Sequence, residues 1–220
     1  MTLILTALCK NGICVCADRR YKKTDSNGAI RLEDNHNKIY PFQEIPYVIL
    51  NHGINEICGK DWKIYCREYE TSNDWEGKSH LQIVNNFKEY IGEVVKRELD
   101  RYKDKEKHAI GFLLGGKPSS ESKYKMSEIH WLRDKGITNP CTTSYIHTYK
   151  RDPLLITGSD DIKAYLIRHI ENNLGDYSNI SKFKNVKKKL VSLFDLAVKK
   201  KQRPDNEDFS DESDFEFIGE

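Results

Sequence analysis

The second residue of the chain has the chemistry of a nucleophile that supplies its own base. Thr2 follows the initiator Met1 directly. Once Met1 is removed, Thr2 carries a hydroxyl and a free α-amine, and a threonine hydroxyl needs a base to take its proton. An α-amine has an ordinary pKa of about 7.7–8.0, so a modest downward shift makes it a base at neutral pH. Taken alone, Thr2 is an ordinary second residue, so its interpretation depends on its surroundings.

The residues after Thr2 predict a β-hairpin. Two apolar runs, 2–9 and 12–17, flank Asn11-Gly12, a strong signal for a hairpin turn. Both runs are almost continuously apolar, which is typical of a sheet covered on both faces. Asp18 closes the second run, so we expect the hairpin to bring Thr2 and Asp18 to the same end.

The remaining elements predict an α+β fold. Apolar residues at helical spacing predict helices over 54–69, 79–102, 160–172 and 182–200. Further strands are expected over 38–42, 46–50, 108–115, 125–132, 144–149, 154–157 and 215–218. Gly53 lies in the turn before the first helix, and Ser159 is a good N-cap for the third. This order lacks the strict alternation of a doubly wound sheet and favours two central sheets with helix pairs outside.

Composition excludes several classes of function. The 220 residues carry a net charge of only +2, which gives no global argument for nucleic acid or membrane as partner. None of the six cysteines forms a Cys-x-x-Cys pair or a zinc spacing, and no glycine-rich phosphate loop follows a strand, so we expect no metal and no cofactor. No apolar run reaches the roughly 20 residues of a spanning helix. We expect one cytoplasmic domain over 1–220, with an acidic segment at 205–214.

The order of motifs along the chain resembles that of proteasome β-type subunits and their bacterial relatives, which are N-terminal nucleophile hydrolases. The resemblance covers nearly the whole chain and implies a four-layer αββα sandwich. The residues that carry it are Thr2, the hairpin 3–16 with its Asn-Gly turn, Ala17-Asp18-Arg19-Arg20, Lys38-Ile39, Gly53 and Thr157-Gly158-Ser159.

The resemblance also implies a role for each site residue. Thr2 would be the nucleophile, and the Lys38 ammonium would lower the pKa of its α-amine because like charges disfavour each other. Asp18 would hold Lys38 charged and oriented. The Gly53 N–H would stabilise the oxyanion, His52 being the less suitable neighbour. Ser159 would hydrogen-bond near the threonine amine.

The chain departs from the family pattern at three places. Asp160 replaces the glycine that follows the serine, and Lys22 stands where the family has a substrate-binding threonine. Before the last strand the family has an aspartate, then a serine three residues later and a glycine. Here Glu207 with Ser210 keeps the spacing with a different acid, whereas Ser213 lies nearer the strand without an acid at that spacing.

Three functions are compatible with these residues. The first is a threonine peptidase that cleaves peptides or unfolded proteins, assembles as a homo-oligomeric ring and receives substrate from a separate ATPase unfoldase. The second is a proteasome-fold protein without protease activity, either an inactive scaffold or an amidohydrolase acting on small acyl-amides. The third is an interaction module built on the lysines of 187–189 and 199–201, although a solvated helix face is the preferred interpretation of that charge.

Overall fold

The computed structural model describes residues 2–24, 30–102, 108–134, 137–141, 147–148, 154–173, 183–201 and 209–219. Every strand pairing among them is antiparallel, and four helices accompany the sheets in this part of the chain. The predicted α+β class is therefore confirmed.

The first sheet is built on the N-terminal hairpin. Its strand order is β13-β1-β2-β14. The strands are β1 (Ile4–Cys9), β2 (Gly12–Asp18), β13 (Leu154–Thr157) and β14 (Ser213–Gly219). The register pairs Ile4 with Ala17 in the hairpin and with Thr157 on the other side. Asp18 pairs with Ser213, so the hairpin is flanked by β13 on one side and by β14 on the other.

The second sheet has the order β11-β10-β9-β6-β5, with β12 (His147–Thr148) also pairing with β10. Its strands are β5 (Ile39–Pro41), β6 (Tyr47–Gly53), β9 (His108–Gly116), β10 (Lys125–Asp134) and β11 (Ile137–Cys141). Ile39 lies opposite Leu50, which places Lys38 at the end of the sheet where β6 terminates.

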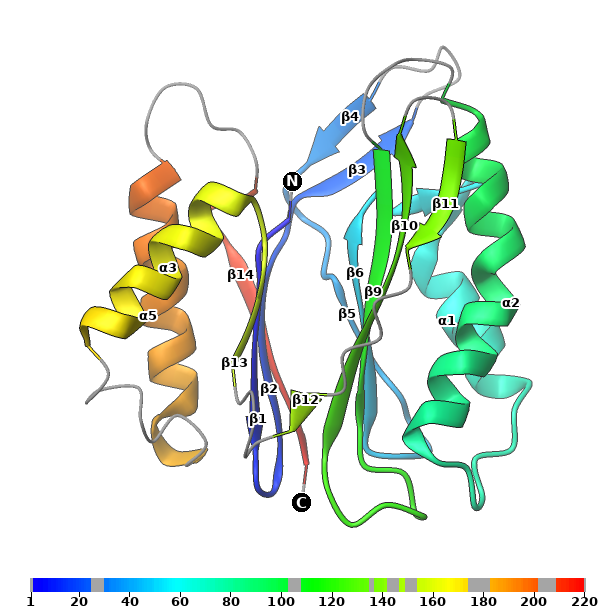
Figure 1. Cartoon of the computed structure of the whole chain (residues 1–220), viewed down its shortest axis with the longest axis horizontal. Coiled ribbons are helices and arrows are strands. Elements are labelled where there is room, and N and C mark those ends of the chain that lie inside the picture. The colour runs from blue at the N-terminus through cyan, green and yellow to red at the C-terminus, as the bar shows by residue number, and fades with distance from the viewer. Residues whose placement is uncertain are drawn as a thin grey trace.

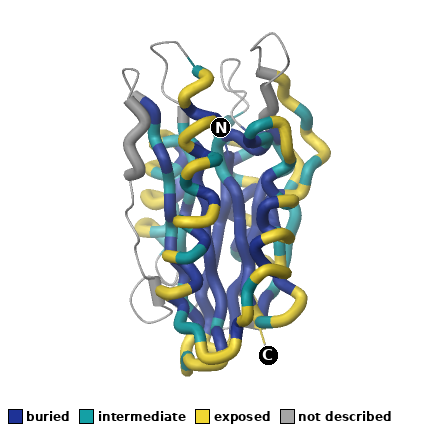
Figure 2. Tube along the Cα trace, turned by 90° about the vertical axis from the view of Figure 1, so that its right-hand side faces the viewer, coloured by how far each residue is buried: buried dark blue, intermediate teal, exposed yellow. Residues whose placement is uncertain are grey.

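Helices cover the outer side of each sheet (Figure 1). α3 (Asp160–Asn172) and α5 (Phe183–Lys201) lie beside the first sheet, and α1 (Trp62–Thr71) and α2 (His80–Asp100) beside the second. Three apolar clusters fill the layers, one under each helix pair and one between the sheets. Figure 2 shows the buried strands at the centre and exposed residues along the helices. None of the described helices is long and apolar enough to cross a membrane.

Two local predictions were wrong. The first helix begins at Trp62 rather than near residue 54, because residues 56–61 form a tight hairpin of β7 (Glu56–Ile57) and β8 (Lys60–Asp61). The turn places Cys58 at φ 49° and Gly59 at φ 78°, a left-handed conformation that interrupts a helix. The polar stretch 19–37 contains an unpredicted pair, β3 (Tyr21–Thr24) and β4 (Ile30–Glu33). By contrast, the helix predicted from residue 79 is present as α2, where Ser79 and Gln82 form a capping box.

Candidate active site

Thr2, Asp18 and Lys38 meet in one buried cluster. Lys38 Nζ donates a hydrogen bond to Thr2 Oγ1 at 2.9 Å and lies 2.9 and 3.0 Å from the two Asp18 carboxylate oxygens. Both side chains of the ion pair are 0% exposed, and Thr2 is 4% exposed. The structure therefore brings together the three residues that the sequence singled out: the threonine hydroxyl, the lysine ammonium and the carboxylate expected to hold that ammonium.

Alternation along β1 explains which way Thr2 faces. Leu3 and Leu5 belong to the cluster under α3 and α5, whereas Ile4 and Leu8 belong to the cluster between the sheets. Because side chains alternate along an extended strand, Thr2 points toward the second sheet. Lys38 comes from that sheet, where its carbonyl accepts the Asn51 N–H at 3.4 Å. The cluster thus spans the gap between the two sheets.

Backbone N–H groups hold the Asp18 carboxylate. Leu3 N donates to Oδ1 at 2.8 Å, and Arg20 N donates to Oδ2 at 2.9 Å. Asp18 N in turn donates to the Leu3 carbonyl at 3.0 Å, which extends the hairpin ladder to the residue after Thr2. A buried charge is tolerated only when it is paired and hydrogen-bonded, and Asp18 meets both conditions. The carboxylate is therefore fixed against the lysine and against the start of β1.

Gly53 ends β6 beside the cluster. It lies two residues beyond Asn51, which is bonded to Lys38, and it has φ +85°. A Cβ built on Gly53 would lie 2.1 Å from the Ala109 carbonyl oxygen, so this position requires glycine. The neighbouring His52 points its ring across Gly111, and its Nε2 is 3.4 Å from Glu128 Oε1. No hydrogen bond or ion pair within the described residues joins Gly53 or His52 to Thr2.

Ser159 follows the end of β13 in the first sheet. The pairing of β1 with β13 ends at Ile4 and Thr157, and the same register extended by two residues would set Ser159 opposite Thr2. A Cβ on Gly158 would lie 3.6 Å from the Thr2 carbonyl oxygen. The Ser159 hydroxyl accepts the Ile162 N–H at 3.4 Å and so acts as the predicted N-cap of α3. Asp160, in the first turn of that helix, is exposed.

Ser210 is the cluster residue to which the sequence assigned no role. Its N–H points to Asp18 Oδ2 at 3.4 Å, and its hydroxyl accepts the Arg19 N–H at 2.8 Å while donating to the Glu212 carbonyl at 2.8 Å. Ser210 is 1% exposed. The spacing from Glu207 could have identified it, but Glu207 and the Lys22 side chain lie outside the described residues.

The hairpin cysteines are poor alternatives to Thr2 as nucleophile. Cys9, Cys14 and Cys16 belong to the cluster under α3 and α5 and so face away from Lys38. Burial raises the pKa of Cys16 to about 11, which keeps its thiol neutral at physiological pH. Within the described ranges, no group of three His, Cys, Asp or Glu side chains is placed to hold a metal ion.

No protein-family model and no curated protein matches the chain. Solved structures do match over its full length. Anbu (ancestral beta-subunit) from Yersinia bercovieri has a TM-score of 0.54 and 13% identity, covering 99% of this chain and 81% of that one. The Anbu complex from Pseudomonas aeruginosa, described as a helical assembly, has a TM-score of 0.58, 13% identity and coverages of 99% and 81%. A Gly-1 mutant of Anbu from Hyphomicrobium sp. strain MC1 has a TM-score of 0.58, 12% identity and coverages of 100% and 82%.

These neighbours correct one expectation. The sequence motifs indicated a β-type subunit of the proteasome, but the structures that the chain resembles are Anbu proteins, which are not proteasome β-subunits in the strict sense. Identity of 12–13% is informative about fold only. The chain therefore has a proteasome-like fold similar to that of Anbu, the ancestral beta-subunit.

Proposed function

We propose that this chain is an N-terminal threonine hydrolase that cleaves peptide bonds through an acyl-enzyme on Thr2 after Met1 has been removed. The single observation that carries the proposal is the Lys38 ammonium, which donates to Thr2 Oγ1 at 2.9 Å while bound to a buried Asp18. An ordinary core threonine needs no buried charge pair beside its hydroxyl. A nucleophilic one benefits, because an adjacent ammonium favours the negative charge that develops on its oxygen.

In the proposed reaction, Thr2 Oγ1 attacks the carbonyl carbon of the scissile amide. The hydroxyl proton passes to the α-amine of Thr2, directly or through water, and then to the departing amine as the C–N bond breaks. Water attacks the resulting ester, the carboxylic acid leaves, and the proton returns to Oγ1. Lys38 stays charged throughout and holds the pKa of the α-amine down, so that the amine is unprotonated when it must act as base.

We assign the oxyanion donor to the N–H of Gly53. Its position at the end of β6, two residues beyond the partner of Lys38, and its positive φ support this assignment. Donors fixed before the reaction stabilise a developing oxyanion at no reorganisation cost. Ser159, which the extended register of β1 and β13 would set opposite Thr2, is assigned to orient the α-amine. Its hydroxyl would then serve both that amine and the N-cap.

The proposal extends to architecture and partners. We infer one domain over residues 1–220, arranged as the four-layer αββα sandwich of N-terminal nucleophile hydrolases, and the order of sheets and helices in Figure 1 supports this. The substrates are peptides or unfolded proteins, with a separate ATPase as the source of unfolded chains. Self-assembly into a homo-oligomeric ring is part of the proposal. The helical assembly of the P. aeruginosa Anbu complex supports self-association of this fold.

One observation favours a second candidate, an inactive scaffold or an amidohydrolase of small acyl-amides. The Ser159 hydroxyl is engaged by the helix N-terminus, and Asp160 adds a carboxylate next to it. In the scaffold reading, the Asp18–Lys38 pair would only join the two sheets. The scaffold differs from the peptidase in that Thr2 does not react, and the amidohydrolase differs from it in the amides that Thr2 attacks.

The test combines intact mass with a threonine-directed probe. Mass spectrometry should show loss of Met1, followed by one adduct of a peptide epoxyketone or vinyl sulfone on Thr2. Thr2→Ala should abolish the adduct, and Lys38→Ala should slow its formation by about 10²–10⁴-fold, the range typical of acid–base assistance. Thr6→Ala is the matched control, because Thr6 is a buried threonine on the same strand face as Thr2.

Retention of Met1 would refute the catalytic assignment, because the amine would then be part of a peptide bond. Equal labelling of the Thr2→Ala variant would refute it as well. Labelling of Thr2 with no turnover of peptides, but with hydrolysis of small acyl-amides, would identify the amidohydrolase instead.

A further inference from the structure

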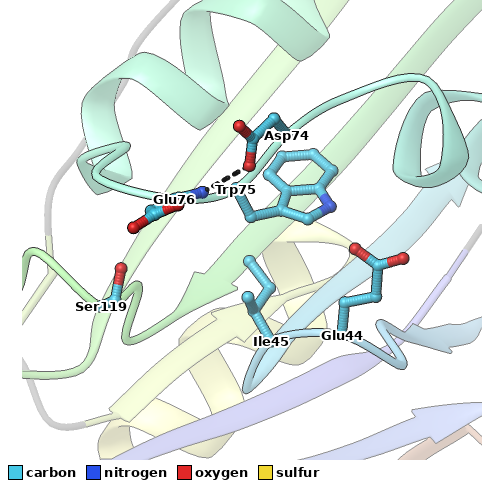
Figure 3. A pocket seen from close by; sticks show the side chains of 6 residues that line it. All are labelled: Glu44, Ile45, Asp74, Trp75, Glu76 and Ser119. Atoms are coloured by element: carbon cyan, nitrogen blue, oxygen red, sulfur yellow. Dashed lines mark hydrogen bonds between the residues drawn. The ribbon is translucent and has the colours of Figure 1, made fainter.

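An open depression lies at the end of the second sheet that is remote from Thr2. It lies between the loop before β6, the loop before α2 and the loop after β9. The residues that line it are Glu44, Ile45, Asp74, Trp75, Glu76 and Ser119 (Figure 3). β6 begins beside this depression at Tyr47 and ends beside the cluster at Gly53. Seven residues at about 3.3 Å each place the two sites roughly 20 Å apart.

The depression presents three carboxylates that lack a cation. Glu44, Asp74 and Glu76 are exposed, and no residue in the described part of the chain forms an ion pair with any of them. Asp74 only accepts the Glu76 N–H at 3.0 Å. The nearby Lys78 binds Asn73 Oδ1 at 3.0 Å, and its Nζ lies 5.3 Å from the centroid of the Trp75 ring. The Lys78 ammonium therefore already makes a cation–π contact with the Trp75 indole.

Trp75 adds an observation of a different kind. The residue is only 4% exposed, and its indole Nε1 has no hydrogen-bond partner among the described residues. Figure 3 shows the indole nitrogen on the side of the ring that faces Glu44. An indole N–H is a donor only, and leaving it unpaired costs free energy. The wall of the depression therefore holds a buried N–H without an acceptor, covered on the side of the exposed Glu44 and close to carboxylates that form no ion pair among the described residues.

We propose that this depression binds an arginine side chain on a segment of a partner polypeptide. The guanidinium lies between the carboxylates of Glu44, Asp74 and Glu76, and a backbone carbonyl of the same segment accepts the Trp75 N–H. Glu44 is exposed, so its side chain can turn aside to admit that acceptor. Arginine suits the site better than lysine, because its planar fork bonds carboxylates bidentately and stacks on aromatic faces. A free small cation would satisfy the carboxylates and leave the indole donor unpaired.

The indole N–H of Trp75 provides a direct measurement. The chain has three tryptophans, so a ¹⁵N-labelled sample gives three indole signals, and Trp75→Phe identifies the one that matters. Titration with N-acetyl-arginine amide should shift the Trp75 signal saturably and leave Trp62 and Trp131 in place. N-acetyl-citrulline amide is nearly isosteric but neutral, and it should bind with at most a tenth of the affinity of N-acetyl-arginine amide.

Variants separate the site from general charge. The double variant Glu44→Gln/Glu76→Gln should weaken binding at least tenfold. Glu89→Gln, which removes an exposed carboxylate on α2 outside the depression, should leave it unchanged. Thr2→Ala should also bind normally, so this inference stands or fails independently of the proposed hydrolase.

Two results would overturn the inference. One is an unmoved Trp75 signal at probe concentrations up to about 0.1 M, well above the millimolar range in which a single anchored residue binds. The other is equal binding of the arginine and citrulline probes. A third result concerns the partner. If an arginine-containing peptide binds no better than the single residue, no backbone carbonyl of a longer segment bonds the Trp75 N–H, and the partner is not a polypeptide.

Discussion

Replacing Lys38 by methionine should destabilise the fold because it leaves the Asp18 charge buried without its cation. Both side chains are 0% exposed. Removing one partner of a buried ion pair costs about 3–5 kcal/mol. Leu3, Arg20 and Ser210 still donate backbone N–H groups to the carboxylate, so we expect the lower part of that range, about 3 kcal/mol. For a domain with a stability of about 5–15 kcal/mol, that is a large fraction.

A double-mutant cycle isolates the pair from the loss of packing. Asp18→Asn alone removes the negative charge that pairs with Lys38. It also sets an amide NH₂ group among N–H groups that need an acceptor. Combined with Lys38→Met, it removes both charges. We therefore expect the double variant to be less destabilised than the sum of the single variants by about 1–3 kcal/mol, as found for residues in direct contact.

Urea unfolding followed by far-UV circular dichroism measures these free energies, with unchanged m-values as the check on two-state behaviour. The matched control is Lys60→Met, which breaks a 3.6 Å pair with Glu68 whose side chains are 53% and 49% exposed. An exposed pair contributes about 0–1 kcal/mol. If Lys38→Met costs no more than Lys60→Met, or if the cycle is additive, the buried pair does not contribute to stability in this way.

Three further predictions concern the surroundings of the cluster. Gly53 has a positive φ and lies close to the Ala109 carbonyl, so Gly53→Ala should lower the free energy of unfolding by about 1–3 kcal/mol in the same urea assay. An unchanged urea midpoint would contradict this. Ser210→Ala removes the 2.8 Å bond of the part-buried Arg19 N–H, which then keeps only the Glu212 carbonyl at 3.2 Å, so it should cost about 0.5–1.5 kcal/mol, whereas Ser120→Ala, on an exposed loop, should cost less. Burial lowers the pKa of His80 to about 4, so between pH 6.5 and 4 the unfolded state binds a proton that the folded state does not. Stability should therefore fall by about 3 kcal/mol as the pH drops through that window, and His80→Gln should flatten the dependence; equal slopes for both proteins would show that another group is responsible.

The sequence was informative about the site wherever the signals are local. The Asn11-Gly12 turn fixes the hairpin, and the hairpin register sets Asp18 beside Leu3. The position of Lys38 followed from a resemblance in motif order, which the geometry of the cluster matches. Ser159 as an N-cap was likewise readable from residue type and position.

Two features could not be read in this way. Residues 54–58 have helical apolar spacing, yet Cys58 adopts a left-handed conformation in the tight turn between β7 and β8. That turn is tied by a hydrogen bond from Cys58 N to Glu98 on α2, a partner 40 residues away. Ser210 reaches Asp18 across 192 positions, and spacing alone did not decide between Ser210 and Ser213. Both outcomes depend on tertiary contacts that overrule local pattern.

The pairing of β14 with β2 sets the order in which the cluster can be completed during synthesis. Residues 2–18 are synthesised before residues 210–219, which supply the strand that flanks β2 and the N–H that reaches Asp18. Contacts between such distant segments close late, because the entropy of the long intervening loop opposes them. A nascent chain that ends before Phe209 lacks this closure, and the Asp18 carboxylate misses its Ser210 contact. The threonine cluster is therefore assembled in full only after residues 210–219 have joined the first sheet.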